Sequence, residues 1–327
     1  MASLSRLRDW GLLIFCNLVW SCQFVIYKIV QKQSGPVFAA LLPITIATLL
    51  MVPIVRRQRQ KAAAEGRLGP LPAGDILQFV LIGICGQVVA QVGVAMGSRI
   101  TLASNAALLT LALPIMTALM AFIFLGERMT PVRWLSFALA VAGVLVCAGV
   151  RWGELSYAST KYLLGNVIFF TAIAASAFYN AYSKRLLLRY SALEVLFYSY
   201  LVVVVFMLPV ALCTEPGTFR SLPDFRPQVW LGFLSLAVLQ YFLAMLIFLT
   251  VLTRLDATQA GLSNYLITFL GVLAAVIVLG ERFTANMVIG GLLVLSGTLL
   301  VTLYEERKKP EVAESSRCQP APRRRTP

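Results

Sequence analysis

Residues 125–130 read LGERMT, residues 279–284 read LGERFT, and each copy interrupts a long apolar run. The two copies lie 154 residues apart. Apolar residues match at the same offset nearby, as Gly143 does with Gly297. Apolar matches are common by chance in such sequences, but an ungapped Gly-Glu-Arg-x-Thr within them is not. The recurrence predicts that the chain consists of two related halves.

The composition predicts a membrane protein. Of the 327 residues, 59% are hydrophobic and 13% are charged, and the mean hydropathy is +0.82, whereas a typical soluble domain carries about 25% charged residues. A helix needs about 20 apolar residues to cross hydrocarbon. Ten segments meet this length, near residues 10–30, 36–55, 76–97, 101–125, 131–150, 161–183, 192–213, 227–252, 257–279 and 284–304.

The predicted fold is therefore all-α and integral to the membrane, with ten transmembrane helices in two five-helix halves. These halves are residues 1–155 and 156–304. Because five is odd, successive halves enter the membrane from opposite sides and form inverted repeats. Inverted repeats place a substrate site near the bilayer midplane and expose it to each side in turn. We therefore expect a secondary transporter that works by alternating access.

The distribution of charge predicts the orientation. With the N-terminus in the cytoplasm, 20 of the 28 Lys and Arg residues fall on the cytoplasmic side, as the positive-inside rule requires. Both termini are then cytoplasmic, and residues 305–327 form a disordered basic tail. Topology explains the net charge of +14, so we expect no nucleic acid among the partners, which are a small-molecule substrate and the lipid bilayer.

Two stretches resemble the drug/metabolite transporter superfamily, in its EamA-like branch. They are NLVWSCQFVIYK at residues 17–28 and ASNAALLTLALPIMTALMAFIFLGERMT at residues 103–130, and the likeness extends over residues 10–304. The resemblance implies a small-molecule permease. It also implies that the first, third, fourth, sixth, eighth and ninth helices surround a central cavity, while the fifth and tenth serve as scaffold.

Polar side chains within hydrocarbon are costly and tend to face a cavity or a partner. The candidates for substrate binding are Trp20, Gln23, Tyr27, Lys28, Gln87, Gln91, Asn105, Tyr179, Asn180, Gln240, Tyr241, Asn264 and Tyr265. For Gln87 and Gln91, which share a helix face, the alternative is hydrogen bonding between helices. For Lys28, the alternatives are attraction of an anionic substrate and extension to the lipid headgroups.

Small residues in the third predicted helix, at Gly83, Gly86, Ala90, Gly93 and Gly97, predict close approach of another helix. In the fourth, Pro114 leaves the carbonyl of Thr110 without its usual donor, which predicts either a gating hinge or a kink that neighbouring helices stabilise.

The two LGER motifs are expected to end helices rather than to catalyse. Gly126 and Gly280 can each end a helix, and the pairs that follow are Glu127 with Arg128 and Glu281 with Arg282. In inverted halves these pairs lie on opposite faces of the bilayer, about 30 Å apart. They cannot share a substrate.

The sequence argues against several kinds of chemistry. It contains no His and no CxxC pair, so we expect no metal site, cofactor or Cys-His catalytic pair. Five of the six cysteines fall within apolar segments, where we expect small buried side chains. The acids Asp75, Glu194 and Asp256 fall at predicted helix ends. With no acid inside the membrane to carry protons, we expect facilitated diffusion or exchange.

We therefore predict a permease, not an enzyme, that exports or exchanges amino acids, related polar or amphipathic metabolites, or drugs. Phosphorylated, nucleotide-linked or lipid-linked sugars are the alternative substrates. A membrane-embedded transferase and a non-transporting scaffold are less favoured. The expected location is the bacterial cytoplasmic membrane, with the protein a monomer or a homodimer.

Overall fold

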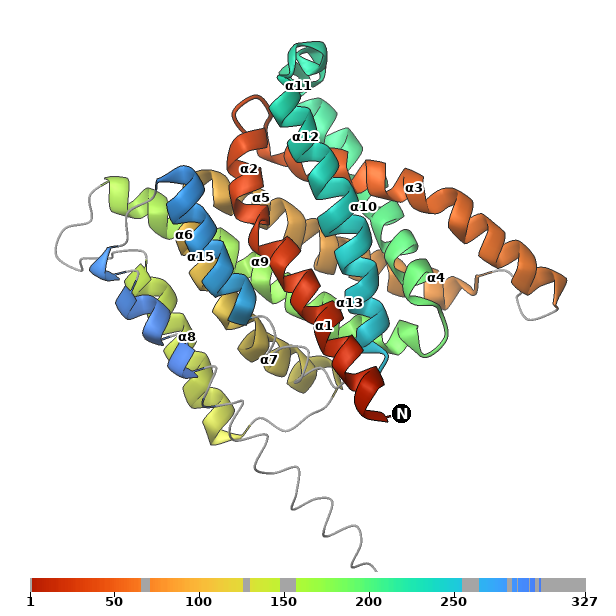
Figure 1. Ribbon diagram of the computed structural model, residues 1–327, viewed down its shortest axis with the longest axis horizontal. Helices are drawn as coiled ribbons and strands as arrows, with labels where there is room; N and C mark the ends of the chain where they lie inside the picture. The colour runs from red at the N-terminus through yellow and green to blue at the C-terminus, as the bar shows by residue number, and fades with distance from the viewer. Residues whose placement is uncertain are drawn as a thin grey trace, which may run out of the picture.

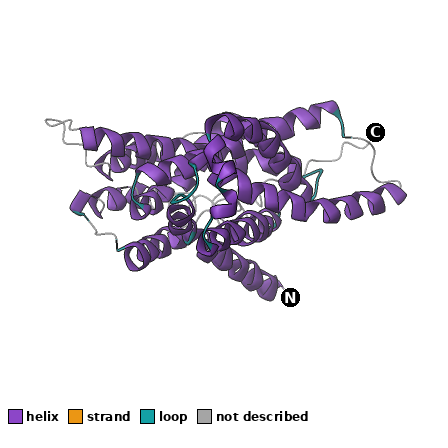
Figure 2. Ribbon diagram, turned by 90° about the horizontal axis from the view of Figure 1, so that it is seen from above, coloured by secondary structure: helices purple, strands orange, loops and turns teal. Residues whose placement is uncertain are grey.

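Long apolar helices lie side by side through the molecule (Figure 1). The structure is a computed structural model that describes residues 2–65, 71–125, 130–147, 157–254, 265–280 and, near the end of the chain, 284–286, 288–293, 295–297 and 300. Within these residues all regular secondary structure is helical, as Figure 2 shows. The predicted all-α class is confirmed.

The helices follow one another with short connections. The first part of the chain forms α1 (Ala2–Ser21), α2 (Gln23–Val30), α3 (Pro36–Ala64), α4 (Ala73–Leu81), η1 (Ile82–Val88), α5 (Val89–Ile100), α6 (Ala103–Leu109), η2 (Thr110–Ala112), α7 (Leu113–Leu125) and α8 (Pro131–Cys147). The second part forms α9 (Tyr157–Leu187), α10 (Ala192–Thr214), α11 (Pro216–Arg220), η3 (Leu222–Asp224), α12 (Pro227–Ser235), η4 (Leu236–Ala244), α13 (Met245–Leu252) and α15 (Tyr265–Leu279).

Within the described part of the chain, six helical stretches are long and apolar enough to cross a membrane. They are Arg8–Val30, Pro36–Ala64, Ala73–Ile100, Leu163–Leu187, Ala192–Thr214 and Pro227–Leu252. Shorter apolar helices cover Asn105–Thr117, Leu270–Leu279 and Val288–Gly297. The protein is therefore an integral membrane protein.

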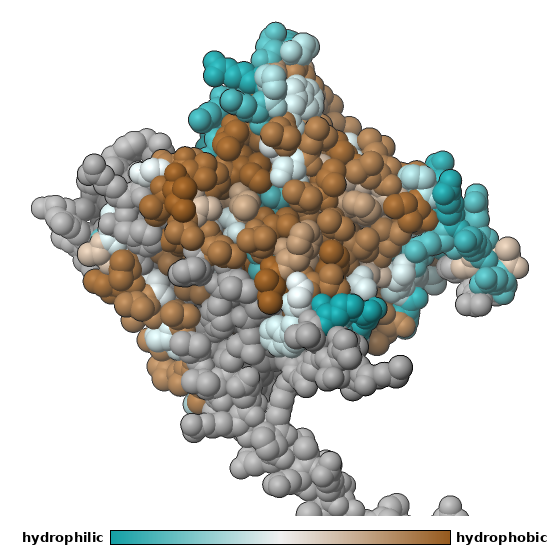
Figure 3. All heavy atoms as spheres, in the orientation of Figure 1, coloured by the Kyte–Doolittle hydropathy of each residue, from teal (hydrophilic) through white to brown (hydrophobic). Residues whose placement is uncertain are grey.

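The surface has the apolar character that lipid contact requires. Figure 3 shows apolar side chains across the middle of the molecule, with hydrophilic ones gathered at α11 and at the end of α3. Leu77, Val205 and Ile277 are 69%, 60% and 71% exposed. So extensive an apolar surface on this face would be unfavourable in water, because soluble proteins rarely expose patches larger than a few hundred Å².

The expectation that the cysteines are buried is correct for Cys16 but wrong for Cys22, Cys85 and Cys213, which are exposed. The physical reason is that the outer surface of a spanning helix faces hydrocarbon. A small apolar thiol is as stable there as in the protein interior, so an apolar segment alone does not predict burial.

Two π-helical segments interrupt the spanning helices. η1 lies between α4 and α5, η4 lies between α12 and α13, and their first residues, Ile82 and Leu236, are 154 residues apart. This is the offset at which the LGER motif recurs. π-Helical turns are rare and often occur at functional sites.

The glycine-rich face of η1 and α5 is packed against other helices, as predicted. Gly86, Gly93 and Gly97 face α9, and a Cβ atom on Gly93 would lie 2.7 Å from the Cβ of Ala172. Gly83 faces α10 instead, where a Cβ would lie 2.6 Å from a valine side chain. Because η1 departs from α-helical geometry, the stripe meets two partners rather than one.

The helix around Pro114 changes type rather than losing a hydrogen bond. A 3-10 turn, η2, directly precedes α7, and the N–H of Leu113 donates to the carbonyl of Thr110. Since Pro114 has no N–H to reach that carbonyl, the tighter turn supplies the missing donor. The Thr110 hydroxyl also lies 3.0 Å from that of Thr268 on α15.

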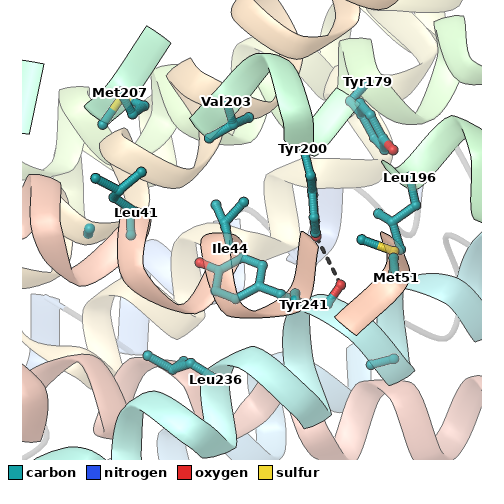
Figure 4. Close-up of a cluster of buried hydrophobic side chains, with 14 of the residues drawn as sticks. Leu41, Ile44, Met51, Tyr179, Leu196, Tyr200, Val203, Met207, Leu236 and Tyr241 are labelled. Carbon is teal, nitrogen blue, oxygen red and sulfur yellow. Dashed lines mark hydrogen bonds between the residues drawn. The ribbon is translucent and has the colours of Figure 1, made fainter. Parts of the chain in front are cut away.

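The largest buried cluster joins α3, α10 and η4 (Figure 4). Ile44 from α3, Val203 from α10 and Leu236 from η4 are at most 1% exposed. At the edge of this cluster the Tyr200 hydroxyl donates to the carbonyl of Tyr241, at 3.1 Å. The cluster packs η4, and with it the predicted site residues Gln240 and Tyr241, against α3 and α10.

At the α11 end of the bundle, a carboxylate caps a distant helix. The side chain of Glu215 accepts hydrogen bonds from the N–H groups of Val37 and Phe38, both at 2.9 Å. These are the second and third residues of α3, and the first, Pro36, has no N–H to satisfy. Gly35 makes the approach possible, because a Cβ there would lie 2.0 Å from the Glu215 carboxyl carbon.

We expect Glu215→Gln to lower the free energy of unfolding by about 1–2 kcal/mol, because an amide has one acceptor oxygen and no charge to match the helix terminus. Thermal unfolding of the purified protein measures this. Asp224→Asn is the matched control, since Asp224 is exposed and contributes its carbonyl, not its carboxylate, to the described contacts. Equal losses in the two variants would contradict the capping role.

Ion pairs hold the opposite end, where the chain begins. Asp9 pairs with Arg254 and Asp75 with Arg189, both at 3.2 Å. Tyr190 donates its hydroxyl to Asp75 at 2.7 Å. Burial, together with this hydrogen bond, raises the pKa of Tyr190 to about 12, so it remains a neutral donor at physiological pH.

Glu194 lies in the first turn of α10 and forms a capping box with Ser191, so both Asp75 and Glu194 lie at helix ends. Asp256 lies outside the described residues.

Candidate functional site

A cavity of about 130 Å³ lies at the centre of the bundle. Its walls come from α1, α2, α5, η2, α7, α9, α10, η4, α13 and α15. The lining residues are Trp20, Gln23, Phe24, Gln91, Val94, Thr110, Leu113, Phe169, Ile173, Ser176, Asn180, Tyr200, Gln240, Tyr241, Met245, Phe248 and Ile267. Elements distant in sequence thus meet around one hollow, and six of the predicted residues line it.

A chain of hydrogen bonds runs along one side of the cavity. Of its members Gln91 and Tyr241 line the cavity, whereas Tyr27 and Gln87 do not. The hydroxyls of Tyr27 and Tyr241 are hydrogen-bonded, Tyr241 donates to Oε1 of Gln91 at 3.0 Å, and Nε2 of Gln91 donates to Oε1 of Gln87 at 3.0 Å. Because Tyr241 spends its single hydrogen on Gln91, Tyr27 must be the donor of the first bond. These hydrogen bonds link α2, η4, α5 and η1.

Gln240 presents an acceptor that no residue in the described part of the chain uses. Its side chain lines the cavity and is 3% exposed. Its Oε1 atom accepts no hydrogen bond from any residue that the structure describes. A buried polar atom without a partner costs about 1–3 kcal/mol, so an N–H or O–H group from a ligand would be bound favourably here.

Aromatic rings form much of the remaining wall. Trp20 packs edge-on against Phe248, with ring centroids 5.3 Å apart, and Phe24 lies 5.9 Å from Phe169. Such rings offer apolar area and electron-rich faces that attract cationic groups. Among the described lining residues there is no Asp, Glu, Lys or Arg. The cavity therefore combines amides, hydroxyls and aromatic faces without a formal charge.

Lys28 and Asn105 do not line this cavity. The amine of Lys28 donates to the carbonyl of Thr101, at 2.7 Å. Asn105 donates to Oδ1 of Asn166 at 2.7 Å and to the Thr101 hydroxyl at 2.9 Å. Because Thr101 follows the last residue of α5, the amine lies where a positive charge stabilises the C-terminal end of a helix.

Tyr179 is also placed away from the cavity lining. It is 1% exposed, and its hydroxyl lies 3.3 Å from that of Ser199. It lies against Gly86, and so it belongs to the contact between η1 and α9.

Several predicted residues lie outside the described part of the chain. They are Asn264, Gly126, Glu127, Arg128, Glu281 and Arg282. Tyr265 begins α15, but its side chain is not described, and the same holds for the side chain of Pro114. Gly280 follows the last residue of α15 and has a φ of 65°, a conformation that glycine adopts without strain.

Of the aromatic lining residues the sequence predicted Trp20 and Tyr241 but missed Phe24, Phe169, Tyr200 and Phe248, and it missed the aliphatic lining residues. On α9 the signal was present, because Phe169, Ile173, Ser176 and Asn180 are spaced 4-3-4 and so share one face. Apolar members of such a face cannot be told from lipid-facing residues by composition. Tyr200 was missed because α10 was not among the helices implied to surround the cavity.

The sequence matches a known family along most of its length. Residues 10–149 and residues 163–303 each match the EamA-like transporter family. The chain belongs to this family. Its relatives in the drug/metabolite transporter superfamily are named as transporters, not as enzymes. An EamA-like transporter binds a small-molecule substrate and resides in the lipid bilayer.

Among the named relatives of this EamA-like transporter, a probable terminal-alkyne amino-acid exporter of Streptantibioticus cattleyicolor is 27% identical over 89% of this chain and 92% of its own. An uncharacterized transporter of Archaeoglobus fulgidus is 24% identical over 90% and 98%. An S-adenosylmethionine uptake transporter of Rickettsia conorii is 23% identical over 65% and 67%.

A solved crystal structure shares the fold of this EamA-like transporter. It superposes with a TM-score of 0.60 over 92% of this chain and 99% of its own, at 17% sequence identity. The agreement extends over nearly the whole chain, so the arrangement of helices described above is that of a known fold.

Proposed function

We propose that the protein is a secondary transporter that exports or exchanges small zwitterionic or neutral compounds of the amino-acid type, including amphipathic ones. The observation that carries this is the central cavity, whose described lining offers amides, hydroxyls and aromatic faces but no formal charge. We propose no catalytic role and no cofactor.

The substrate class follows from the matching of charge. A phosphate group carries charge that needs Lys, Arg or a helix terminus to replace its water, and no such side chain is among the described lining residues. A zwitterion carries its own compensating charge. Its ammonium can donate to the unused oxygen of Gln240 and lie against an aromatic face, while an apolar side chain fills the aliphatic wall.

The names of two relatives support the same class. One is named as an amino-acid exporter and the other as an S-adenosylmethionine uptake transporter. Both names refer to compounds that contain an amino-acid group. One relative is named for export and the other for uptake. We base the proposed direction of transport on the exporter, because its similarity covers more of this chain.

We further propose that ten spans form two inverted halves, residues 1–155 and 156–304, that alternately expose the cavity. Three observations support this: the LGER motif recurs at an offset of 154 residues, π-helical segments begin at the same offset, and the family matches the chain in two consecutive segments. The proposed location is the bacterial cytoplasmic membrane, with both termini cytoplasmic and the protein a monomer or a homodimer.

The proposal is tested with a panel of ligands on the purified protein. Thermal unfolding is measured with amino acids of varied side chain, their N-methylated and sulfonium derivatives, sugar phosphates and nucleotides. We expect stabilisation by one or more amino-acid-type compounds and none by the phosphorylated ones. Stabilisation by phosphorylated compounds alone would overturn the substrate class in favour of phosphorylated or nucleotide-linked sugars.

Transport is then measured with the stabilising compound in proteoliposomes. We expect labelled substrate to enter in exchange for unlabelled substrate inside, without an imposed pH gradient, because none of the acids that the structure describes lines the cavity. A strict requirement for a pH gradient would overturn the exchange mechanism while leaving the substrate class intact.

A further inference from the structure

A second hollow lies at the α11 end of the bundle, between α2, α12 and the end of α15. Its volume is about 850 Å³, within the range of ligand-binding pockets. None of its lining residues also lines the central cavity. We call it the α2–α12 groove.

The α2–α12 groove is positively charged at its outer end. Lys32 and Arg226 line it, and both side chains are exposed. The other described lining residues include no Asp or Glu. Lys32 lies just beyond the span that ends at Val30, and Arg226 lies just before the span that begins at Pro227. The two cations are therefore at the boundary between hydrocarbon and water.

Most of the remaining lining is apolar and belongs to the spans, with Gln33, Gln228 and Ser235 as its uncharged polar members. Ile26 and Ile29 come from α2, Leu231 from α12 and Val278 from α15. Leu231 is 69% exposed and Val278 is 59% exposed. The wall of the groove is cationic at the end of the bundle and mostly apolar toward its middle.

A pair of hydrogen bonds fixes the cationic end before any ligand binds. The N–H of Arg226 donates to Oε1 of Gln33 at 2.8 Å, and Nε2 of Gln33 lies 3.4 Å from the carbonyl of Asp224. The segment after α2 is thereby tied to the start of α12. The backbones that carry Lys32 and Arg226 are held together, which reduces the entropy lost on binding.

We propose that the α2–α12 groove binds one anionic phospholipid, with its phosphate between Lys32 and Arg226 and an acyl chain along Ile29, Leu231 and Val278. Two cations beside an apolar wall, with no acid among the described lining residues, favour an anionic phospholipid over other ligands. A zwitterionic lipid would gain little from two cations without an acid, and a soluble phosphate would gain nothing from the apolar wall. A phospholipid joins an anionic headgroup to apolar acyl chains, and the groove presents its cations and its apolar wall in the same order.

The test compares lipids that differ only in headgroup. The full-length protein in a neutral detergent is titrated with dioleoyl phosphatidylglycerol or dioleoyl phosphatidylcholine, and binding is followed by native mass spectrometry and by the thermal unfolding midpoint. We expect the anionic lipid to bind more tightly. Because each cation near the membrane surface strengthens binding to anionic lipid about fivefold, Lys32→Gln with Arg226→Gln should weaken it about 25-fold.

Controls separate this site from general surface charge and from a soluble anion. Arg220→Gln removes an exposed cation on α11 outside the groove and should leave the affinity unchanged. Leu231→Ser should weaken binding of the lipid, and inorganic phosphate should not stabilise the protein at the same concentrations. Equal affinity for the two lipids, an equal loss in Arg220→Gln, or stabilisation by inorganic phosphate alone would each overturn the proposal.

Discussion

Replacing Gly93 by alanine is expected to destabilise the protein, although the same exchange in an exposed helix interior usually stabilises by about 1 kcal/mol. The added Cβ would lie 2.7 Å from the Cβ of Ala172 and 3.3 Å from the carbonyl of Ile168. Overpacking of this kind costs about 1–3 kcal/mol or more, so the penalty outweighs the gain in helix propensity. Thermal unfolding in detergent measures the net effect.

Two further variants make the result specific to helix contact. Gly74→Ala is the matched control, because a Cβ there would meet nothing within 4 Å, and it should leave the midpoint unchanged or raise it. Combining Gly93→Ala with Ala172→Gly removes the closest clash, so the double variant should lose less stability than the two single variants together. Simple additivity would show that α5 and α9 do not meet in this way.

Gln240→Leu is expected to weaken substrate binding tenfold or more and to leave the unliganded protein as stable as before or more stable. The side chain of Gln240 lines the cavity, and its Oε1 atom has no partner among the described residues. Removing an unsatisfied buried acceptor does not cost stability, whereas losing a hydrogen bond to a charged donor costs about 1.5–3 kcal/mol of binding. The shift of the unfolding midpoint with a stabilising compound measures both quantities.

Gln58→Leu serves as the control, because Gln58 is exposed near the end of α3 and far from the cavity. It should bind the compound normally. If Gln240→Leu bound the compound as tightly as the unmodified protein, Gln240 would have no part in recognition. If it failed to accumulate, Gln240→Met, which also lacks the acceptor oxygen and has a similar length, would report binding instead.

The hydropathy and the low fraction of charged residues predicted the membrane location and the helical class. Both properties are averaged over many residues, so a few exceptions do not change the prediction. The close helix contacts of the glycine-rich face of η1 and α5 were predictable for the same reason. Several small residues on one face of a helix allow another helix to approach closely. Six cavity residues could be selected, among them Gln23, Gln91 and Asn180, because an amide in hydrocarbon needs a partner.

Other features depend on single contacts that no pattern reveals. The amine of Lys28 binds the carbonyl of Thr101, which neither of the sequence alternatives anticipated. Glu215 caps α3 from 178 residues away in the chain, and only the folded arrangement brings that carboxylate to the helix. The phenylalanines of the cavity lining were not predicted, because Phe24 and Phe248 are as compatible with lipid as with a substrate.

The π-helical turn in η4 determines which chemical groups the substrate meets. A π turn contains one residue more than an α-helical turn, and each residue advances the helix by about 100°. Leu239, directly before Gln240, is 39% exposed to the lipid side, whereas Gln240 is 3% exposed. Without the additional residue, the part of the helix beyond it would rotate by one position. Gln240 would then take the position of Leu239 in hydrocarbon, and Tyr241, whose hydroxyl donates to Gln91, would take the position of Gln240. The additional residue in the π turn therefore directs both polar side chains toward the centre.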